Sequence, residues 1–213
     1  EFVFGDWVSN VCSFELFFWT VANLDLVGDP EIIAGDLALR SDGKLYWYNP
    51  LIKDALVAYG NFDEDLYPEI VAVSNGKVFM LEHDGIVKWG PVDVPPVGGS
   101  GPPASGQDNG GPPIVADFDG DGDAEFGVAG GRAFSVFEGD GSVRWSRVTR
   151  DLSSSVTGSA VFDFEGDGTA EVVYRDELHL YVFRGTDGEV LLKLPMNNLT
   201  HMELPVIADV DGD

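Results

Sequence analysis

The stretch "ADFDGDGDAE", residues 116–125, places four aspartates, one glutamate and two glycines in ten positions. Carboxylates this close together repel one another unless a cation neutralises them. The acids occupy alternate positions of the frame D-x-D-x-D-G-x-x-E, which runs from Asp117 to Glu125. Strong acidity alone is typical of a soluble surface or a salty habitat, but it does not explain acids at a fixed spacing.

The acidic frame recurs along the chain, and internal recurrence is the first sign of a repeat architecture. Residues 163–171 repeat it 46 positions later, and residues 209–213 open it again after another 46. Upstream, residues 61–69 fit the frame, and residues 23–31 fit it more weakly because Val27 replaces the third acid. The chain therefore contains five occurrences, of which the last is cut short.

A second motif keeps step with the acidic frame. An Asp-Gly pair followed four residues later by tryptophan, or by Leu192 in the last copy, comes after each of the first four acidic stretches. The four copies are "SDGKLYW" (41–47), "HDGIVKW" (83–89), "GDGSVRW" (139–145) and "TDGEVLL" (186–192). Chance clustering of acids would not keep a second motif in phase over four copies.

Short apolar runs between the motifs predict β-strands. The second copy reads "EIVAVS", Asn-Gly at 75–76, "KVFMLEH", Asp-Gly at 84–85 and "IVKWG". Asn-Gly and Asp-Gly pairs between such runs indicate two-residue hairpin turns, so each repeat contains about four antiparallel strands. Residues 77–81 have apolar side chains on both faces, which is typical of a strand buried on two sides.

Four-stranded repeats of about 40 to 46 residues predict an all-β fold, the β-propeller, with sheets stacked around an axis. Tandem β-sandwiches are the alternative, but such a domain usually needs roughly 100 residues. We expect residues 1–213 to form a partial propeller of four to five blades. The expected blades are roughly 15–50, 51–92, 112–149, 157–195 and, as a start only, 203–213.

Residues 90–113 are rich in proline and glycine and nearly free of large apolar side chains. This composition predicts a long loop between blades, either a tolerated surface insertion or a binding loop. The sequence ends at Asp213, inside the fifth acidic stretch. We therefore expect these residues to be part of a longer protein.

Oxygen ligands at alternate loop positions, with glycine at the bend, suit a hard divalent cation, and calcium accepts six to eight oxygens. In the loop at 117, positions one, three and five point to one side, and Gly122 at position six permits the turn. Position seven offers its backbone carbonyl, and the glutamate at position nine closes the site. The first half resembles an EF-hand loop, but the closing acid comes earlier and no helix flanks it.

The candidate metal ligands follow this frame loop by loop. They are Asp117, Asp119, Asp121, Asp123 and Glu125; Asp163, Glu165, Asp167, Thr169 and Glu171; Asn61, Asp63, Asp65, Tyr67 and Glu69; Asp209, Asp211 and Asp213; and Asn23, Asp25 and Glu31. The expected cofactor is Ca²⁺.

The phrase "PPIVADFDGDGDAEFGVAGG", with its Phe126-Gly127 pair, is very similar to the FG-GAP repeat, also called the VCBS-type repeat. The resemblance covers nearly the whole chain from about Thr20. It implies a calcium-bearing β-propeller with the ion in the hairpin between the first two strands of a blade, and seven blades in the intact protein. Propellers of integrin α-subunits have the same kind of loop, but nothing in this sequence indicates an integrin.

Individual loops depart from the frame. The loop at 163 has Glu165 at position three, which is longer but still a ligand. The loop at 61 begins with asparagine and has Leu66 in place of the glycine at position six. In the loop at 23, Val27 cannot coordinate, so we expect a weak or empty site. The loop at 209 lacks its closing residue.

Charge and composition limit the partners. The chain has 37 acidic and 12 basic residues, a net charge of -25, which disfavours nucleic acid and anionic membranes. A single cysteine, Cys12, excludes an intrachain disulfide, and no apolar run is long enough to span a bilayer. Extracellular calcium modules bind at about 10⁻⁴–10⁻³ M, which favours an extracellular, periplasmic or cell-surface location.

No convergent catalytic set is evident, since the three histidines lie in different repeats. The tryptophans at 47, 89 and 145 are expected to pack between blades, or alternatively to stack on sugars. Asn198 begins a glycosylation sequon. These features predict an extracellular binding or adhesion module for a protein or glycan. The alternatives are the propeller of a polysaccharide lyase, catalytic or not, and a structural spacer or surface-layer element.

Overall fold

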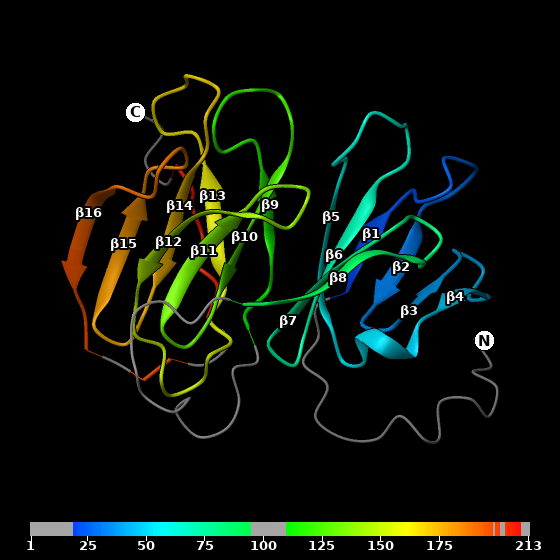
Figure 1. Ribbon diagram of the computed structural model, residues 1–213, viewed down its shortest axis with the longest axis horizontal. Helices are drawn as coiled ribbons and strands as arrows, with labels where there is room; N and C mark the ends of the chain where they lie inside the picture. Colours follow the sequence, from blue (N-terminus) through cyan, green and yellow to red (C-terminus); the bar gives the residue numbers. More distant parts are fainter. Residues whose placement is uncertain (1–18, 95–109, 198, 201–202, 210–213) are drawn as a thin grey trace.

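The computed structural model describes residues 19–94, 110–197, 199–200 and 203–209 as four separate four-stranded sheets. Every sheet is an antiparallel meander, in which each strand pairs with the next one along the chain. Figure 1 shows the sheets side by side, with consecutive sheets as neighbours. The prediction of an all-β, partial β-propeller fold is confirmed.

The strands are short and evenly distributed among the sheets, with the 3-10 helix η2 (Pro50–Ile52) between the first two. The first sheet contains β1 (Thr20–Ala22), β2 (Glu31–Ala34), β3 (Leu37–Leu39) and β4 (Leu45–Tyr48). The second contains β5 (Leu56–Gly60), β6 (Glu69–Ser74), β7 (Lys77–Leu81) and β8 (Val87–Asp93). The third contains β9 (Ile114–Ala116), β10 (Glu125–Ala129), β11 (Ala133–Phe137) and β12 (Val143–Val148). The fourth contains β13 (Ser159–Phe162), β14 (Glu171–Arg175), β15 (His179–Phe183) and β16 (Val190–Pro195).

The first strands of the sheets lie beside one another. Strand β5 contacts both β1 and β9, and β9 also contacts β13, although none of these strands shares a sheet. The later strands of each sheet fan outward from this row (Figure 1). This arrangement is an arc of a propeller, with the first strand of each blade innermost.

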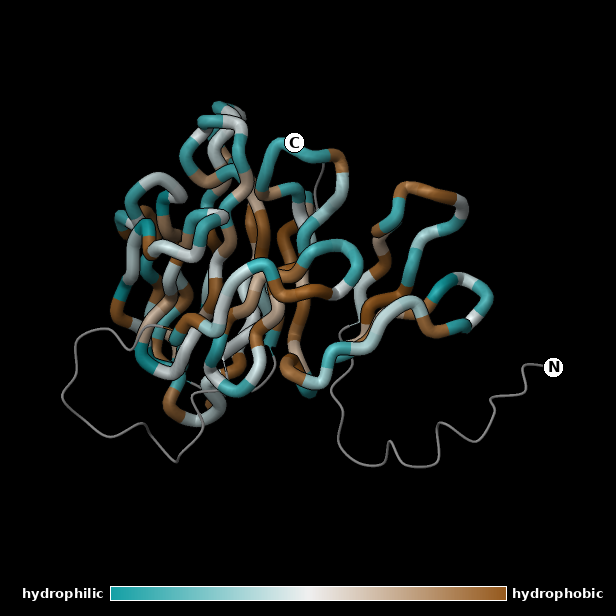
Figure 2. The backbone as a smooth tube through the Cα atoms, turned by 45° about the vertical axis from the view of Figure 1, so that its right-hand side comes forward, coloured by the Kyte–Doolittle hydropathy of each residue, from teal (hydrophilic) through white to brown (hydrophobic). Residues whose placement is uncertain are grey.

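The middle strands are buried on both faces, as their sequence predicts. In β6, Ile70 and Ala72 belong to the apolar core shared with the first sheet. Their neighbours Val71 and Val73 belong to the core shared with the third sheet. Because successive side chains of a strand point to opposite faces, one strand contributes to two cores. Brown and white segments run through the packed strands in Figure 2, and teal dominates the loops.

The turn predictions hold at one position and fail at another. Asn75 and Gly76 join β6 to β7 as a two-residue turn, both with positive φ, as a type I′ hairpin requires. The Asp-Gly pair at 84–85 belongs to a longer turn, in which the Gly85 N–H donates to the Glu82 carbonyl. Only Gly85 of that pair has positive φ, so the expected two-residue turn is wrong there. The Asp84 carboxylate instead accepts the N–H of Ile86, two residues on.

The repeated tryptophans join each sheet to the next. The indole N–H of Trp47 donates to the His83 carbonyl at 3.1 Å, and that of Trp89 donates to the Gly139 carbonyl at 2.9 Å. Trp145 donates to the Gly185 carbonyl at 2.5 Å. Each acceptor lies just before the Asp-Gly turn of the following sheet. Trp47 and Trp145 are only 8% and 6% exposed, so the packing interpretation is confirmed and these rings are not open sugar platforms.

Some expectations differ from the structure or lie outside its described part. Strand β8 runs through Asp93, so residues 90–93 of the Pro/Gly-rich segment belong to that strand, and Val92 and Asp93 pair with β7. Proline is tolerated there because β8 is the outer edge strand. Residues 95–109, Cys12, Asn198 and residues 210–213 of the expected fifth blade fall outside the described ranges. Within those ranges, no helix is long and apolar enough to cross a membrane.

We predict that Gly188→Ala destabilises the fold far more than Gly43→Ala, as measured by urea unfolding. Both glycines have positive φ, at 71° and 79°, so both substitutions cost similar backbone strain. A Cβ at Gly188 would lie 2.5 Å from the Trp145 ring, whereas a Cβ at Gly43 meets nothing within 4 Å. Overpacking of this kind typically costs about 1–3 kcal/mol. Equal losses of unfolding free energy in the two variants would contradict the tryptophan contact.

Candidate metal sites

Four acidic loops occupy the same place in the four sheets, between the first and second strands. They span residues 23–30, 61–68, 117–124 and 163–170. The closing pair has the same register each time: Ala22 with Glu31, Gly60 with Glu69, Ala116 with Glu125 and Phe162 with Glu171. Because each sheet is a meander with its first strand innermost, all four loops emerge on one face, the upper side in Figure 1.

The closing glutamate is buried in every loop and begins the second strand. One oxygen of each glutamate accepts the backbone N–H of the second loop residue. The four bonds are Leu24 to Glu31 at 2.9 Å, Phe62 to Glu69 at 2.8 Å, Phe118 to Glu125 at 2.7 Å and Phe164 to Glu171 at 3.0 Å. The second oxygen of each glutamate is left for another ligand.

In the loop at 117, the first aspartate holds the backbone in a coil around itself. One oxygen of Asp117 accepts the N–H groups of Asp119 and Gly120, and the other accepts that of Gly122 at 3.0 Å. Gly122 has φ of 95°, so the glycine expected at this bend is required by the backbone. Asp163 likewise accepts three N–H groups in the fourth sheet, those of Gly166, Asp167 and, at 2.8 Å, Gly168.

The folded loops bring carboxylates together as the frame predicts for positions one, three and nine. Oxygen atoms of Asp117, Asp119 and Glu125 all lie within 4.8 Å of one another. The same holds for the group Asp163, Glu165 and Glu171. Two oxygens that each lie about 2.4 Å from one ion are at most about 4.8 Å apart, so both groups fit a single calcium-sized cation.

Position five behaves differently from the expectation. Asp121 and Asp167 are outside those two groups, although Asp65, at the same position of the loop at 61, belongs to the group of its own loop. Asp121 accepts the N–H of Asp123 at 2.9 Å, and Asp167 accepts both the N–H and the hydroxyl of Thr169. The backbone carbonyl of position seven, at Asp123, Tyr67 and Thr169, stays a prediction.

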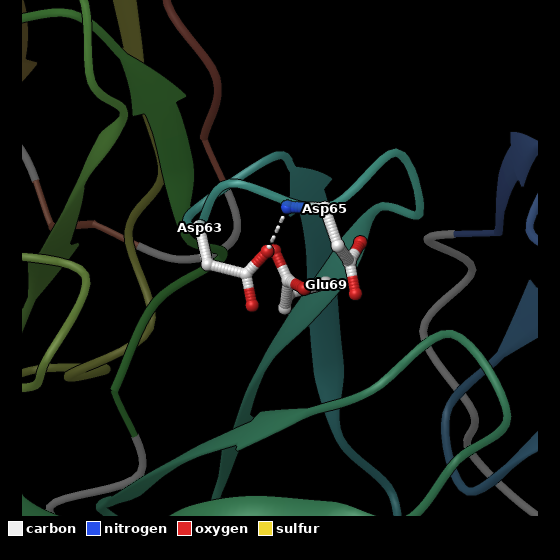
Figure 3. A group of neighbouring side chains, drawn as sticks. All are labelled: Asp63, Asp65 and Glu69. Atoms are coloured by element: carbon white, nitrogen blue, oxygen red, sulfur yellow. Dashed lines mark hydrogen bonds between the residues drawn. The ribbon is translucent and has the colours of Figure 1, made fainter.

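The loop at 61 gathers a different set of acids. Its group within 4.8 Å is Asp63, Asp65 and Glu69. Figure 3 shows Asp63 and Asp65 on the loop and Glu69 on the strand that follows, with the Asp65 N–H donating to Asp63. The side-chain amide N–H of Asn61 donates a hydrogen bond to the Asp65 carbonyl at 2.9 Å. An ionised aspartate at this position has no N–H and could not make this bond.

The weaker loops remain incomplete. In the loop at 23, Arg40 contacts Asp25 at 2.8 Å and Glu31 at 3.6 Å, and the side-chain oxygen of Asn23 is buried with no hydrogen-bond partner. Val27 at position five is 71% exposed. Asp209 is exposed, and Asp211 and Asp213 lie outside the described residues.

Sequence reasoning missed the basic side chains beside these loops. Lys88 pairs closely with Asp63 and lies 3.4 Å from Glu69, and Arg144 lies 2.6 Å from Asp119. Both residues directly precede a repeated tryptophan, which is the pattern that could have indicated them. Burial alone would lower the pKa of Lys88, but its carboxylate partners raise it, so the ammonium stays charged.

Burial also affects the charge of two closing glutamates, Glu125 and Glu171. It raises the pKa of Glu125 to about 7, and the charges of Asp119, Glu138 and Asp121 act in the same direction. Burial likewise raises the pKa of Glu171, with Glu165 contributing. Without a cation, these glutamates therefore favour the protonated form more than free glutamate does, and bound metal would compete with the proton.

In chelator, we predict that Glu125 makes folding less favourable as pH rises from about 4.5 to about 7. The folded carboxyl keeps its proton to a higher pH than the unfolded one, so its contribution is greatest below 4.5 and is lost across this interval. Urea unfolding at several pH values, with Glu125→Gln as the control, measures it. As pH rises, the unfolding free energy of the Glu125→Gln variant should increase relative to that of the wild type. A difference that does not change with pH would contradict the raised pKa.

Several solved structures share this fold. The V. cholerae biofilm matrix protein Bap1 aligns with a TM-score of 0.68 and 16% identity over 92% of this chain. BBS1N in complex with ARL6DN aligns with a TM-score of 0.63 and 11% identity over 84% of this chain. The exotype rhamnogalacturonan lyase YesX aligns with a TM-score of 0.53 and 17% identity over 85% of this chain. The chain spans 58%, 56% and 31% of these three structures, respectively.

No curated protein sequence matches the chain. The family described as the FG-GAP-like repeat matches residues 117–174, which include the loops at 117 and 163 and the strands between them. Over residues 117–174, this propeller arc is therefore similar to the FG-GAP-like repeat.

Proposed function

We propose that this chain is a calcium-stabilised propeller module that binds a protein or glycan partner outside the cytosol. The observation that supports this most strongly is the convergence of three carboxylates in each of three equivalent loops. The residues that would hold the ions are Asp117, Asp119 and Glu125; Asp163, Glu165 and Glu171; and Asp63, Asp65 and Glu69.

Calcium suits these loops better than magnesium does. Calcium accepts six to eight oxygens in flexible geometry, whereas magnesium requires a near-ideal octahedron and keeps several waters. The loops offer carboxylates from a hairpin, and most of these acids are partly or fully exposed. Exposure on one side leaves room for water to complete the coordination sphere.

Bound calcium would have mainly a structural role. Each group places like charges at the point where the first hairpin of a sheet closes, and their repulsion opposes folding. A cation that binds only the folded loop stabilises it by RT ln(1 + [L]/Kd). Because such modules commonly bind at about 10⁻⁴–10⁻³ M, stabilisation at calcium concentrations outside the cell supports an extracellular, periplasmic or cell-surface location.

The binding role rests on the surface that the loops form. The four acidic loops and the Asp-Gly turns emerge on one face, where loops are free to vary around a rigid scaffold. Similar structures include a biofilm matrix protein and a propeller solved with a protein partner, and they share the fold alone. A net charge of -25 favours neutral or cationic partners.

We predict that millimolar calcium raises the melting temperature by several degrees over the same protein in chelator, while equal magnesium gives a much smaller shift. The reason is the neutralisation of the three acidic groups in the folded state. Glu165→Gln should reduce the calcium-dependent shift, and in chelator it should raise rather than lower the melting temperature, because it removes one of the repelling charges.

Glu64→Gln is the matched control, because Glu64 is an exposed acid of the loop at 61 that belongs to none of the three groups. Melting that is indifferent to calcium, or an equal effect of the two substitutions, would show that the loops are acidic turns without a metal role.

The partner class is tested by binding to immobilised polysaccharides and extracellular proteins, with calcium and with chelator. Binding without turnover is expected for an adhesion module. Release of new unsaturated sugar ends, detected by ultraviolet absorbance, would instead indicate a lyase. Absence of binding to every probe would favour the spacer role over the proposed one.

A further inference from the structure

Three of the four acidic loops already face a cation that belongs to the chain itself. Arg40 contacts Asp25 in the first sheet, Lys88 contacts Asp63 in the second, and Arg144 contacts Asp119 in the third. In each case the contacted acid occupies position three of its loop. The three cations therefore reach the same point of three equivalent hairpins.

Lys88 and Arg144 reach this point from equivalent positions. Each immediately precedes the tryptophan that pairs with the third strand, Trp89 with Met80 and Trp145 with Val136. In the first sheet the equivalent residue is Tyr46, and Arg40 lies over its ring at 4.4 Å. The guanidinium thus reaches the loop from the neighbouring turn when the usual position holds an aromatic ring.

The fourth sheet has no such cation. Leu192 pairs with Val182 where the others have tryptophan, so Leu191 occupies the position of Lys88 and Arg144. Among the residues that the structure describes, no lysine or arginine lies within 4.0 Å of an acid in the loop at 163. Position three of that loop, Glu165, is exposed and belongs to a group of three carboxylates.

A cation at position three competes with a metal ion in two ways. It neutralises part of the charge that attracts calcium, and it uses ligand oxygens. In Asp119, one oxygen accepts the N–H of Asp121 and the other contacts Arg144, so both are engaged. In Asp63, one oxygen accepts the N–H of Asp65 and the other contacts Lys88.

We propose that Arg40, Lys88 and Arg144 are built-in competitors of calcium that set the order in which the acidic loops fill. The inference rests on the proposed calcium role. The loop at 163 fills first, at the lowest calcium concentration. The loop at 117 follows, because Arg144 contacts one of its three acids. The loop at 61 fills last, because Lys88 contacts two of its acids, Asp63 and Glu69.

The loop at 23 is the limiting case. Arg40 bridges Asp25 and Glu31, and Val27 removes the acid at position five. The guanidinium there takes the place of the metal, so the first hairpin is closed at any calcium concentration. One chain then combines a calcium-independent hairpin with three hairpins of graded calcium dependence.

Calorimetric titration of the 213-residue chain with calcium, with native mass spectrometry to count bound ions, tests the order. Arg144→Gln should tighten one of the weaker sites roughly three- to tenfold, the effect of removing a unit charge a few Å from a divalent ion. Lys88→Gln should do the same for the weakest site. Arg150→Gln is the matched control, because Arg150 pairs with Glu177 and with no acid of a metal group.

The reciprocal change adds a cation to the loop that lacks one. Leu191→Arg should weaken the tightest site by a similar factor. Leu192→Arg adds the same charge at the next residue of β16, which points to the opposite face and is equally exposed at 41%, and it should change little. Melts in chelator verify that each variant is folded.

The outcomes separate this inference from the proposed function. A wild-type chain that takes up no calcium refutes both. A chain that binds calcium but shows Arg144→Gln equal to Arg150→Gln, or Leu191→Arg equal to Leu192→Arg, refutes the competition alone. The competition is supported if Arg144→Gln and Lys88→Gln each tighten a calcium site relative to Arg150→Gln, and if Leu191→Arg weakens the tightest site.

Discussion

The hydrogen bond from the second loop residue to the buried closing glutamate is the contact on which each sheet depends. It fixes where the first strand ends and the second begins, and its occurrence in all four hairpins gives them one register. A buried carboxylate is costly unless its charge is matched or its oxygens are bonded. Because the backbone satisfies only one oxygen, each hairpin has room for a cation on the other side.

The four hairpins share one backbone register but differ in the groups that face the carboxylates of the acidic loop. In the first sheet a guanidinium bridges Asp25 and Glu31, and in the second an ammonium bridges Asp63 and Glu69. The loops at 117 and 163 instead coil around an aspartate that accepts several backbone N–H groups. A substitution at one position after the Asp-Gly turn therefore alters the electrostatics of the acidic loop between the first two strands of the same sheet.

The repeat, the strand positions and the two-faced burial could be predicted from the sequence, because each depends on local spacing. The sequence also predicted that the acids at positions one, three and nine of a loop lie close together, because the hairpin register follows from the repeated frame. Three features were not predicted. Asp121 and Asp167 turn back to their own backbone, Lys88 and Arg144 approach from a strand distant in sequence, and the tryptophans donate to carbonyls of the next sheet. The first is a local choice of the side chain, and the other two are contacts between segments distant in sequence, which the spacing within one loop does not indicate.

The alternation along β6 also determines how the arc loses structure. Ile70 and Ala72 attach the second sheet to the first, while Val71 and Val73 attach it to the third. A sheet is thus coupled only to its two neighbours, and folding stability becomes a sum of terms along a line, as in other stacked repeats. A destabilising substitution at one interface between sheets therefore separates the arc into two shorter cooperative units and leaves the other interfaces unchanged. A sheet that packs against two neighbours, such as the second, is therefore stabilised by two independent interfaces.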